Sequence, residues 1–210
     1  MYRLLLLLFC VIHLFPSAAV AQDEGGEELL AGMLDSAALS KQRVFRNLGD
    51  ALAKPDSVFR LDLSKQKRKE VPEQIRQLKN LQVLKLSRNN LREIPEWIGE
   101  LKHLQVLDLG YNKLTAIPDS IGSCQELTFL GLNRNLIETL PRTIGRLGKL
   151  RVLEMWDNEV QALPEEIKYL HSLQVLELRG ILFSEAEQQQ IRMLLPDAEI
   201  YFDPSCNCKN

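Results

Sequence analysis

The sequence predicts an α/β solenoid, in which short parallel strands stack into one sheet and short helices or turns return along the opposite face. The first observation is a leucine that recurs every 23 residues, at Leu81, Leu104, Leu127, Leu150 and Leu173. The second is that the other apolar positions recur with it. The third is an asparagine at a fixed place in each unit, at Asn89, Asn112, Asn135 and Asn158. Such a period is typical of stacked units, because one unit cannot bury its apolar face alone.

The strand of each unit is predicted by alternation. In the segment Val83-Leu84-Lys85-Leu86-Ser87, the two leucines point to one face and the other three residues point to the opposite face. Stacking each strand on the next gives a parallel sheet with a continuous core. Six such strands are expected, and together they form a concave face.

The turn after each strand is predicted from the asparagine. There the backbone turns inward and leaves amides without ladder partners. Stacked side-chain amides can satisfy those groups, because each offers both a donor and an acceptor. A proline then opens each return segment, for example Pro95-Glu96-Trp97-Ile98-Gly99-Glu100-Leu101. With proline at its first position, this segment is predicted to be a short helix or turn on the convex face.

The complete pattern, L-x-x-L-x-L-x-x-N-x-L-x-x-I/L-P-x-x-I-x-x-L, resembles the leucine-rich repeat family in its 23-residue form. The resemblance extends over roughly residues 58–203, and the arrangement is similar to that of secreted bacterial members. It implies a leucine-rich repeat solenoid of the α/β class with a helical cap at each end. It implies little about function, since the family binds many unrelated partners.

The boundaries of the parts follow from this pattern. Repeats are expected at 58–80, 81–103, 104–126, 127–149 and 150–172, with a partial repeat at 173–183. Caps are needed because the ends of a solenoid expose its core. A helix that Pro55 stops is expected to form the N-terminal cap over 41–57, after a mixed, partly flexible segment at 22–40. Ser184-Glu185-Ala186-Glu187 is typical of a capping box and opens a C-terminal cap over 184–203, which a strand around Ile200 closes before a tail at 204–210.

Residues 1–21 are predicted to be a secretory signal peptide. Arg3 gives a positive start, an apolar run covers 4–15, and Ala19-Val20-Ala21 is a small-residue cleavage site. A membrane anchor is the alternative, but a run that ends at Pro16 is too short to span a bilayer. The mature chain is therefore expected to be exported, to the periplasm, the cell surface or the medium, after cleavage near Ala21.

Neither charge nor cysteine content points to catalysis. A formal charge of −2 favours neither nucleic acid nor an anionic membrane as partner. No metal-ligand spacing, phosphate loop or catalytic triad is found, so no catalytic residue, metal or cofactor is predicted and the chain is not expected to be an enzyme. Cys124 occupies a leucine position and is expected to be an inert core residue. Cys206 and Cys208 leave three interpretations open: a free or mixed-disulfide tail, a local disulfide, or metal or redox chemistry.

Binding is predicted on the concave face, where outward-facing residues of successive strands form columns. The first column is Arg60, Val83, Val106, Phe129, Val152 and Val175, and the second is Asp62, Lys85, Asp108, Gly131, Glu154 and Glu177. The third is Ser64, Ser87, Gly110, Asn133, Trp156 and Arg179, and just beyond it lie Lys65, Arg88, Tyr111, Arg134 and Asp157.

Aromatic and arginine side chains gather in these columns. They dominate interface hot spots, and burying one large ring is worth roughly 1.5–3 kcal/mol. The valines add contiguous apolar area, and Gly131 is expected to leave a notch beside Phe129. The candidate partner-binding residues are Asp108, Tyr111, Phe129, Arg134, Val152, Glu154, Trp156 and Asp157. The competing interpretation is that the valines are only good strand formers and the aromatic residues are incidental.

These observations predict a non-catalytic, exported module that binds a protein or peptide on its concave face. A different class of function is glycan or cell-wall binding, in which Trp156 and Phe129 would stack on sugar rings. A third is redox action through Cys206 and Cys208. The identity of the partner and the oligomeric state are left open by the sequence.

Overall fold

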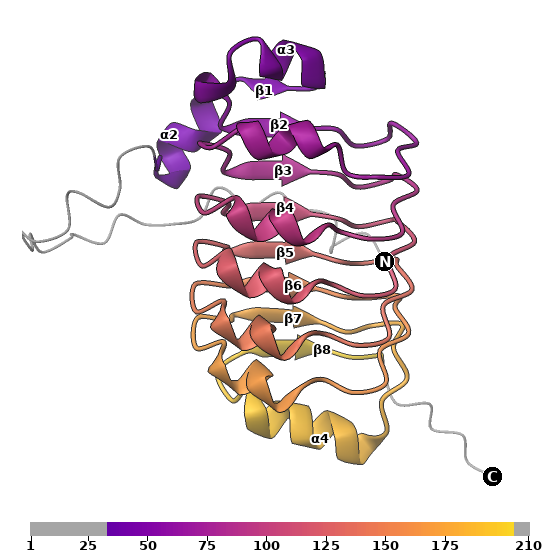
Figure 1. Ribbon diagram of the computed structural model, residues 1–210. Coiled ribbons are helices and arrows are strands. Elements are labelled where there is room, and N and C mark those ends of the chain that lie inside the picture. Colours follow the sequence, from indigo (N-terminus) through magenta and orange to yellow (C-terminus); the bar gives the residue numbers. More distant parts are fainter. Residues whose placement is uncertain (1–32, 204–210) are drawn as a thin grey trace, which may run out of the picture. The chain divides into compact units, whose positions relative to one another are not determined.

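The structure is a computed structural model of the chain, and it describes residues 33–203. The expected signal peptide with its cleavage site at Ala21, residues 22–32, and the tail that holds Cys206 and Cys208 lie outside these residues. Eight parallel strands form one sheet in the order of the sequence (Figure 1). The strands are β1 Val44–Phe45, β2 Arg60–Asp62, β3 Val83–Lys85, β4 Val106–Asp108, β5 Phe129–Gly131, β6 Val152–Glu154, β7 Val175–Glu177 and β8 Glu199–Tyr201.

The register of the repeat strands follows the 23-residue period. Val83 is paired with Val106, and Phe129 is paired with Val152, so equivalent positions stack in columns. The six strands from β2 to β7 are those that the repeats predict. The predicted total of six strands is nevertheless too small. Strand β1 extends the sheet at one end, and β8, the closing strand around Ile200, extends the sheet at the other end.

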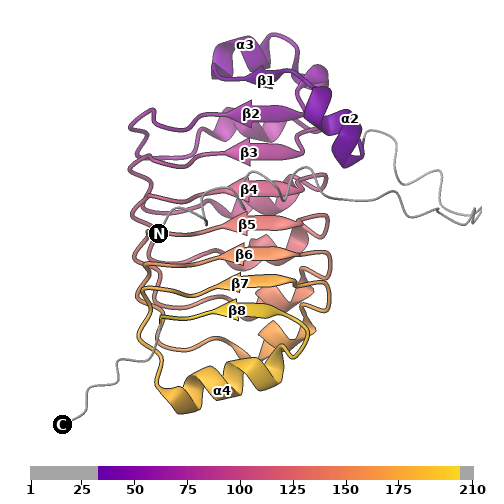
Figure 2. The same cartoon turned by 180° about the vertical axis from the view of Figure 1, so that it is seen from behind.

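The face opposite the strands consists of short 3-10 helices, and the two views in Figures 1 and 2 show the two faces. These helices are η2 Glu73–Gln77, η3 Glu96–Glu100, η4 Asp119–Ser123, η5 Arg142–Arg146 and η6 Glu165–Tyr169. The prolines lie one position earlier than expected, at the N-cap, where Pro95 has φ −71° and ψ 150°. This extended backbone suits proline, whose ring fixes φ near that value and whose missing N–H is not needed there.

Glycines in three of these helices allow the coils to approach closely. A Cβ atom built on Gly122 would lie 2.6 Å from the backbone oxygen of Thr143 in the next coil, and Gly99 and Gly145 stand in equivalent contacts. In η6, which is followed by the α-helix α4 and not by another 3-10 helix, Lys168 occupies the equivalent position. In η2 this position is Arg76. The glycines therefore mark the close contacts that η3, η4 and η5 make with the following coil.

The N-terminal cap differs from the prediction of one helix over 41–57. The structure has α2 Ser36–Lys41, strand β1, α3 Leu48–Leu52 and the 3-10 helix η1 Pro55–Ser57 instead. Two contacts explain the break. Asn47 accepts hydrogen bonds from the N–H groups of Gly49 at 2.7 Å and Asp50 at 3.3 Å, so it starts a new helix. Phe45 enters the core at 7% exposure while its strand pairs with β2.

The C-terminal cap forms as the sequence predicts. Helix α4 spans Glu185–Leu194, and Ser184 and Glu187 form the reciprocal capping box at its start. Ile191 and Leu195 are buried against the last coil. The caps and the repeats therefore share one hydrophobic core, which the regularly spaced leucines of the repeats fill.

The asparagines act as predicted. Asn135 donates to the carbonyl oxygens of Leu109 at 3.1 Å and Leu132 at 2.8 Å, and its Oδ1 accepts from the N–H of Leu114 at 3.1 Å. Asn89, Asn112 and Asn158 make equivalent hydrogen bonds, each to its own coil and to the preceding coil. Each asparagine thus links its turn to the preceding coil and provides hydrogen-bond partners for backbone groups that have none in the sheet.

Candidate functional site

The strands β2 to β7 face the viewer in Figure 2. The surface that we call the strand face is formed by the outward-facing side chains of these strands and of the turns that follow them. Its columns agree with the predicted register, but its apolar area is smaller than expected. Val83 is only 8% exposed, whereas Val106, Phe129, Val152 and Val175 are half-buried. The valine column is therefore available to a partner only from β4 onward.

The N-terminal segment explains why the strand face starts late. The Leu34 N–H donates to Gln82 Oε1 at 3.2 Å, and the Leu34 carbonyl accepts from Gln105 Nε2 at 3.1 Å. These two glutamines precede β3 and β4. Arg60 also donates to the carbonyl of Ser40 at the end of α2, at 2.8 Å. The segment before α2 and α2 itself are thereby held at the starts of the early strands.

The turn after each strand holds a residue in the left-handed backbone region. The φ angles are 57° at Arg88, 59° at Tyr111, 53° at Arg134 and 54° at Asp157. This conformation is uncommon for residues other than glycine. The left-handed conformation sets the direction in which these four side chains leave the turns. The alternation of residues along the strands does not predict this conformation.

Four predicted residues and Arg88 form one group, the aromatic–arginine cluster. The rings of Tyr111 and Trp156 are 5.9 Å apart and nearly perpendicular. The guanidinium carbon of Arg134, from the coil between them, lies 5.2 Å from the centre of each ring. Arg134 Nε also lies 3.0 Å from Asp157 Oδ2, and the guanidinium of Arg88 lies 4.3 Å from the Tyr111 ring. Edge-to-face rings and cation–π contacts each favour this arrangement.

The sequence prediction did not include Arg88 among the candidates. The signal that could have identified it is its place one coil before Tyr111 in the same turn position. The cluster spans four successive coils and is partly exposed, with 53% of the Arg134 side chain and 45% of the Asp157 side chain reached by solvent. Its charged groups thus remain available to a ligand.

Phe129 lies apart from the aromatic–arginine cluster. A Cβ atom on Gly131 would lie 3.0 Å from Phe129 Cε1 and 3.4 Å from Asp108 Oδ1. The Phe129 ring therefore leans over Gly131. The notch expected beside Phe129 is absent from the strand face, because the ring itself fills the space that the missing side chain leaves.

Carboxylates gather in the second column. Glu154 is flanked by Glu177 on β7, while Gly131 separates it from Asp108 on β4. Burial raises the pKa of Glu154 to about 7, and the negative charges of Asp108 and Glu177 add to the effect. Glu177 itself accepts a hydrogen bond from Arg179 Nε at 2.7 Å. Asp108, Glu154 and Glu177 thus form an acidic strip beside the aromatic–arginine cluster.

A metal site, a membrane-spanning helix or a reactive thiol among the described residues would point to other functions. Within residues 33–203, no three His, Cys, Asp or Glu side chains are grouped so that they could hold a metal ion. No described helix is long and apolar enough to cross a membrane. Cys124 is fully buried as predicted. Its Sγ lies 3.4 Å from the Ile98 carbonyl, and burial raises the thiol pKa to about 11.

Stacked parallel strands, a repeating buried asparagine and short return helices define a solenoid repeat protein. A family model described as a leucine-rich repeat region matches residues 58–135. A leucine-rich repeat protein of Leptospira interrogans is 33% identical with a TM-score of 0.64, over 77% of this chain and 48% of that one. The chain is a leucine-rich repeat protein.

Two further solved structures have the same fold. The plant peptide hormone receptor RGFR1, in complex with RGF2, is 32% identical with a TM-score of 0.55, over 63% of this chain and 22% of the receptor. An internalin, inlF, from Listeria monocytogenes is 18% identical with a TM-score of 0.56, over 73% of this chain and 43% of that one. The chain thus spans under half the length of each. No curated protein matches its sequence.

Proposed function

We propose that this chain is an exported, non-catalytic module that binds a protein or peptide ligand on the strand face. The aromatic–arginine cluster carries the proposal. It combines two large rings and two arginines, the side chains that contribute most to binding energy in protein interfaces. Leucine-rich repeat proteins are typically binding modules rather than enzymes, and the similar plant receptor was solved with RGF2.

The aromatic–arginine cluster is held in place before any ligand arrives. Its turns are fixed by the bonds of Asn112, Asn135 and Asn158 to neighbouring coils. Arg134 is fixed further by its ion pair with Asp157 and by the two rings beside it. A ligand therefore meets side chains whose conformational entropy is already reduced, which favours affinity.

The geometry favours a peptide over a glycan. Sugar binding needs a free aromatic face, but guanidinium groups lie over the rings of Tyr111 and Trp156. Phe129, the other aromatic residue proposed for sugar stacking, leans over Gly131. A peptide can instead use the exposed arginines for its carboxylate and carbonyl groups and the ring edges for its apolar side chains.

Export is proposed from the features of residues 1–21. A charged start, a short apolar run and a small-residue site before Gln22 together favour cleavage after Ala21. Mass spectrometry of the chain purified from its native host should show an N-terminus at Gln22. An intact Met1 start on the mature protein would contradict export by this route.

Ligand capture tests the binding face. The immobilised chain is incubated with envelope extract of the native host, either untreated or digested with protease beforehand. The wild type should retain a ligand that protease destroys, and Tyr111→Ala/Trp156→Ala should lose it. Tyr169→Ala is the matched control, because Tyr169 is an exposed aromatic residue, 50% accessible, on helix η6 of the opposite face.

Two outcomes would contradict the proposal. Equal retention by the double variant and the wild type would place binding elsewhere. A ligand that survives protease but is eluted by free sugar would favour the glycan function. Thermal unfolding of each variant, measured in parallel, separates loss of the site from loss of the fold.

A further inference from the structure

The last strand leaves an open edge at the C-terminal end of the sheet. The N–H of Glu199 donates to the Gln174 carbonyl at 2.8 Å, and the Tyr201 carbonyl accepts from the N–H of Leu178 at 2.8 Å. Glu199 and Tyr201 therefore direct their backbone groups toward β7. Successive residues of a strand direct these groups to opposite sides, so the N–H and C=O of Ile200 point away from β7. An open edge of this kind is a template for another strand.

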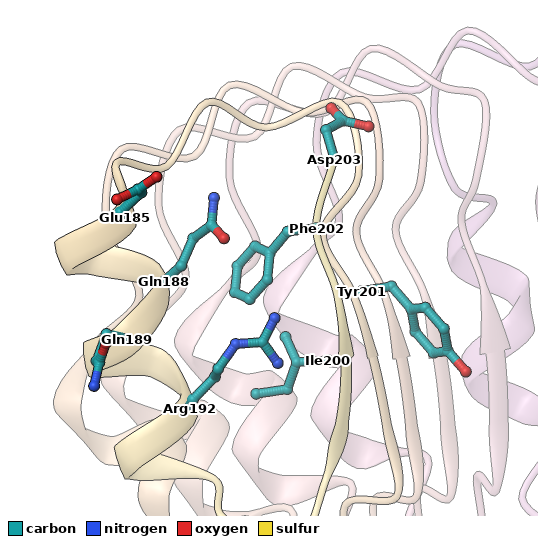
Figure 3. Close-up of a pocket in the computed structure, with 8 residues that line it drawn as sticks. All are labelled: Glu185, Gln188, Gln189, Arg192, Ile200, Tyr201, Phe202 and Asp203. Carbon is teal, nitrogen blue, oxygen red and sulfur yellow. The ribbon is translucent and has the colours of Figure 1, made fainter. Parts of the chain in front are cut away.

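Helix α4 stands opposite this edge and leaves a groove of about 450 Å³ between them. Figure 3 shows the groove, with α4 on one side and β8 on the other. The helix lines it with Glu185, Gln188, Gln189 and Arg192, which are spaced i, i+3, i+4 and i+7 and so share one helix face. The groove therefore runs beside the free edge of β8.

The two walls of the groove complement an extended backbone. One wall offers the N–H and C=O of Ile200. The other offers polar side chains, because Gln189 and Gln188 can donate to or accept from a peptide group, and Gln188 already uses its Nε2 to bond the Phe183 carbonyl at 3.1 Å. Ile200 and Phe202 supply apolar contacts, with the Arg192 guanidinium 5.0 Å from the Phe202 ring.

Opposite charges mark the two ends of the groove. Glu185 and Asp203 lie near one end and Arg192 near the other (Figure 3). Glu185 and Arg192 are seven positions apart on the helix, a rise of about 10 Å. An extended chain covers this distance in about three residues. Side chains of a strand alternate between its two faces, so two that face α4 are an even number of residues apart. A matching strand would therefore carry one basic and one acidic side chain two residues apart, and the long lysine and Arg192 side chains span the remaining distance.

We propose that the groove between β8 and α4 binds an extended peptide segment of a protein partner, which adds a ninth strand to the sheet. The segment carries a basic side chain toward Glu185 and Asp203 and an acidic one toward Arg192. Its backbone bonds to Ile200 on one side and to the glutamines of α4 on the other. This site is separate from the aromatic–arginine cluster, so either can fail without the other.

The probe is a pair of acetylated and amidated hexapeptides, Thr-Asp-Val-Lys-Thr-Thr and Thr-Lys-Val-Asp-Thr-Thr, titrated into the full chain. Nuclear magnetic resonance follows the Ile200 amide. One of the two orders should bind and slow hydrogen exchange of that amide at least tenfold. The order that binds gives the direction of the added strand, because acidic before basic corresponds to a strand parallel to β8.

Two controls separate strand addition from simple charge attraction. N-methylation of the peptide amide that bonds to the Ile200 carbonyl should abolish binding, whereas N-methylation of the C-terminal residue of the same peptide, which extends beyond β8, should leave it. Arg192→Glu should weaken binding at least tenfold. Arg142→Glu, which changes the same charge at an arginine 85% exposed on η5, should have no effect.

The proposal is overturned by any of three results. The first is that neither hexapeptide perturbs the Ile200 amide at millimolar concentration, and the second is that both N-methylated peptides bind alike. The third is that the Ile200 amide is protected in the free chain, which would mean that the edge is already paired. Protection that grows with protein concentration would then assign the edge to a second copy, and protection independent of concentration would assign it to the chain itself.

Discussion

Glu154 provides a test of the electrostatics of the strand face. Its carboxyl group has a pKa of about 7 in the folded chain, against an ordinary value of 4.5, because it is partly buried and lies near the negative charges of Asp108 and Glu177. Between these two pH values the folded chain binds a proton that the unfolded chain has lost. The free energy of unfolding contributed by this group therefore decreases as the pH rises from about 4.5 to 7, and stays low above pH 7.

The magnitude follows from the difference in pKa. A shift from 4.5 to about 7 corresponds to roughly 3 kcal/mol, since one pKa unit is about 1.4 kcal/mol. Water reaches part of the Glu154 side chain and screens its charge, so we expect about 1–2 kcal/mol. Glu154→Gln removes the charge. The variant should therefore be more stable than the wild type by about this amount at pH 8 and nearly equal to it at pH 4.

Urea unfolding at pH 4, 6 and 8 measures the effect. Glu159→Gln is the control, because Glu159 is an exposed carboxylate in the same coil. Its difference from the wild type should not change over this range. If the difference between Glu154→Gln and the wild type is also constant with pH, the carboxyl group is not held at a raised pKa and the acidic strip is better solvated than the structure indicates.

The scaffold offers three further tests. Asn89→Ala removes four hydrogen bonds of 2.8–3.0 Å to backbone groups and should lower the free energy of unfolding by about 3 kcal/mol in a denaturant titration. The control Asn90→Ala, at the adjacent residue, should change the free energy of unfolding by less than about 1 kcal/mol. Gly122→Ala forces a Cβ against the next coil and should cost about 2 kcal/mol, while Gly148→Ala meets nothing within 4 Å and should be nearly neutral. The Cys124 thiol should resist a disulfide reagent at pH 8 until the chain unfolds, as mass spectrometry of the labelled peptide would show, and rapid native labelling would contradict its burial.

Most of the repeat architecture could be predicted because a solenoid brings equivalent positions into contact. The pairing of Val83 with Val106 and of Leu84 with Leu107 follows directly from the 23-residue spacing. The role of Asn135 follows from the chemistry of its amide, since a turn that leaves backbone groups without partners needs a side chain able to donate and accept. Periodicity and local chemistry both act within one coil and its neighbour.

The remaining features depend on contacts that the repeat does not encode. Val44, Leu48 and Leu52 have helical spacing, yet the pairing of β1 with β2 interrupts the predicted helix. Likewise, Leu34 reaches Gln105 across 71 residues, and no pattern indicates that this segment lies at the start of the sheet. The candidate site was predicted in part: alternation identified the columns, but not the turn conformation that brings Tyr111 toward Trp156.

The left-handed turns bear on which side chains serve the fold and which serve binding. A residue other than glycine in this conformation costs of order 1 kcal/mol or more. Gly180 occupies the equivalent place in the last coil, so the turn forms without a side chain there. Arg88, Tyr111 and Arg134 therefore occupy positions where glycine would meet the needs of the backbone. These three side chains converge on one exposed cluster instead of entering the core, which supports the binding that we propose for the strand face.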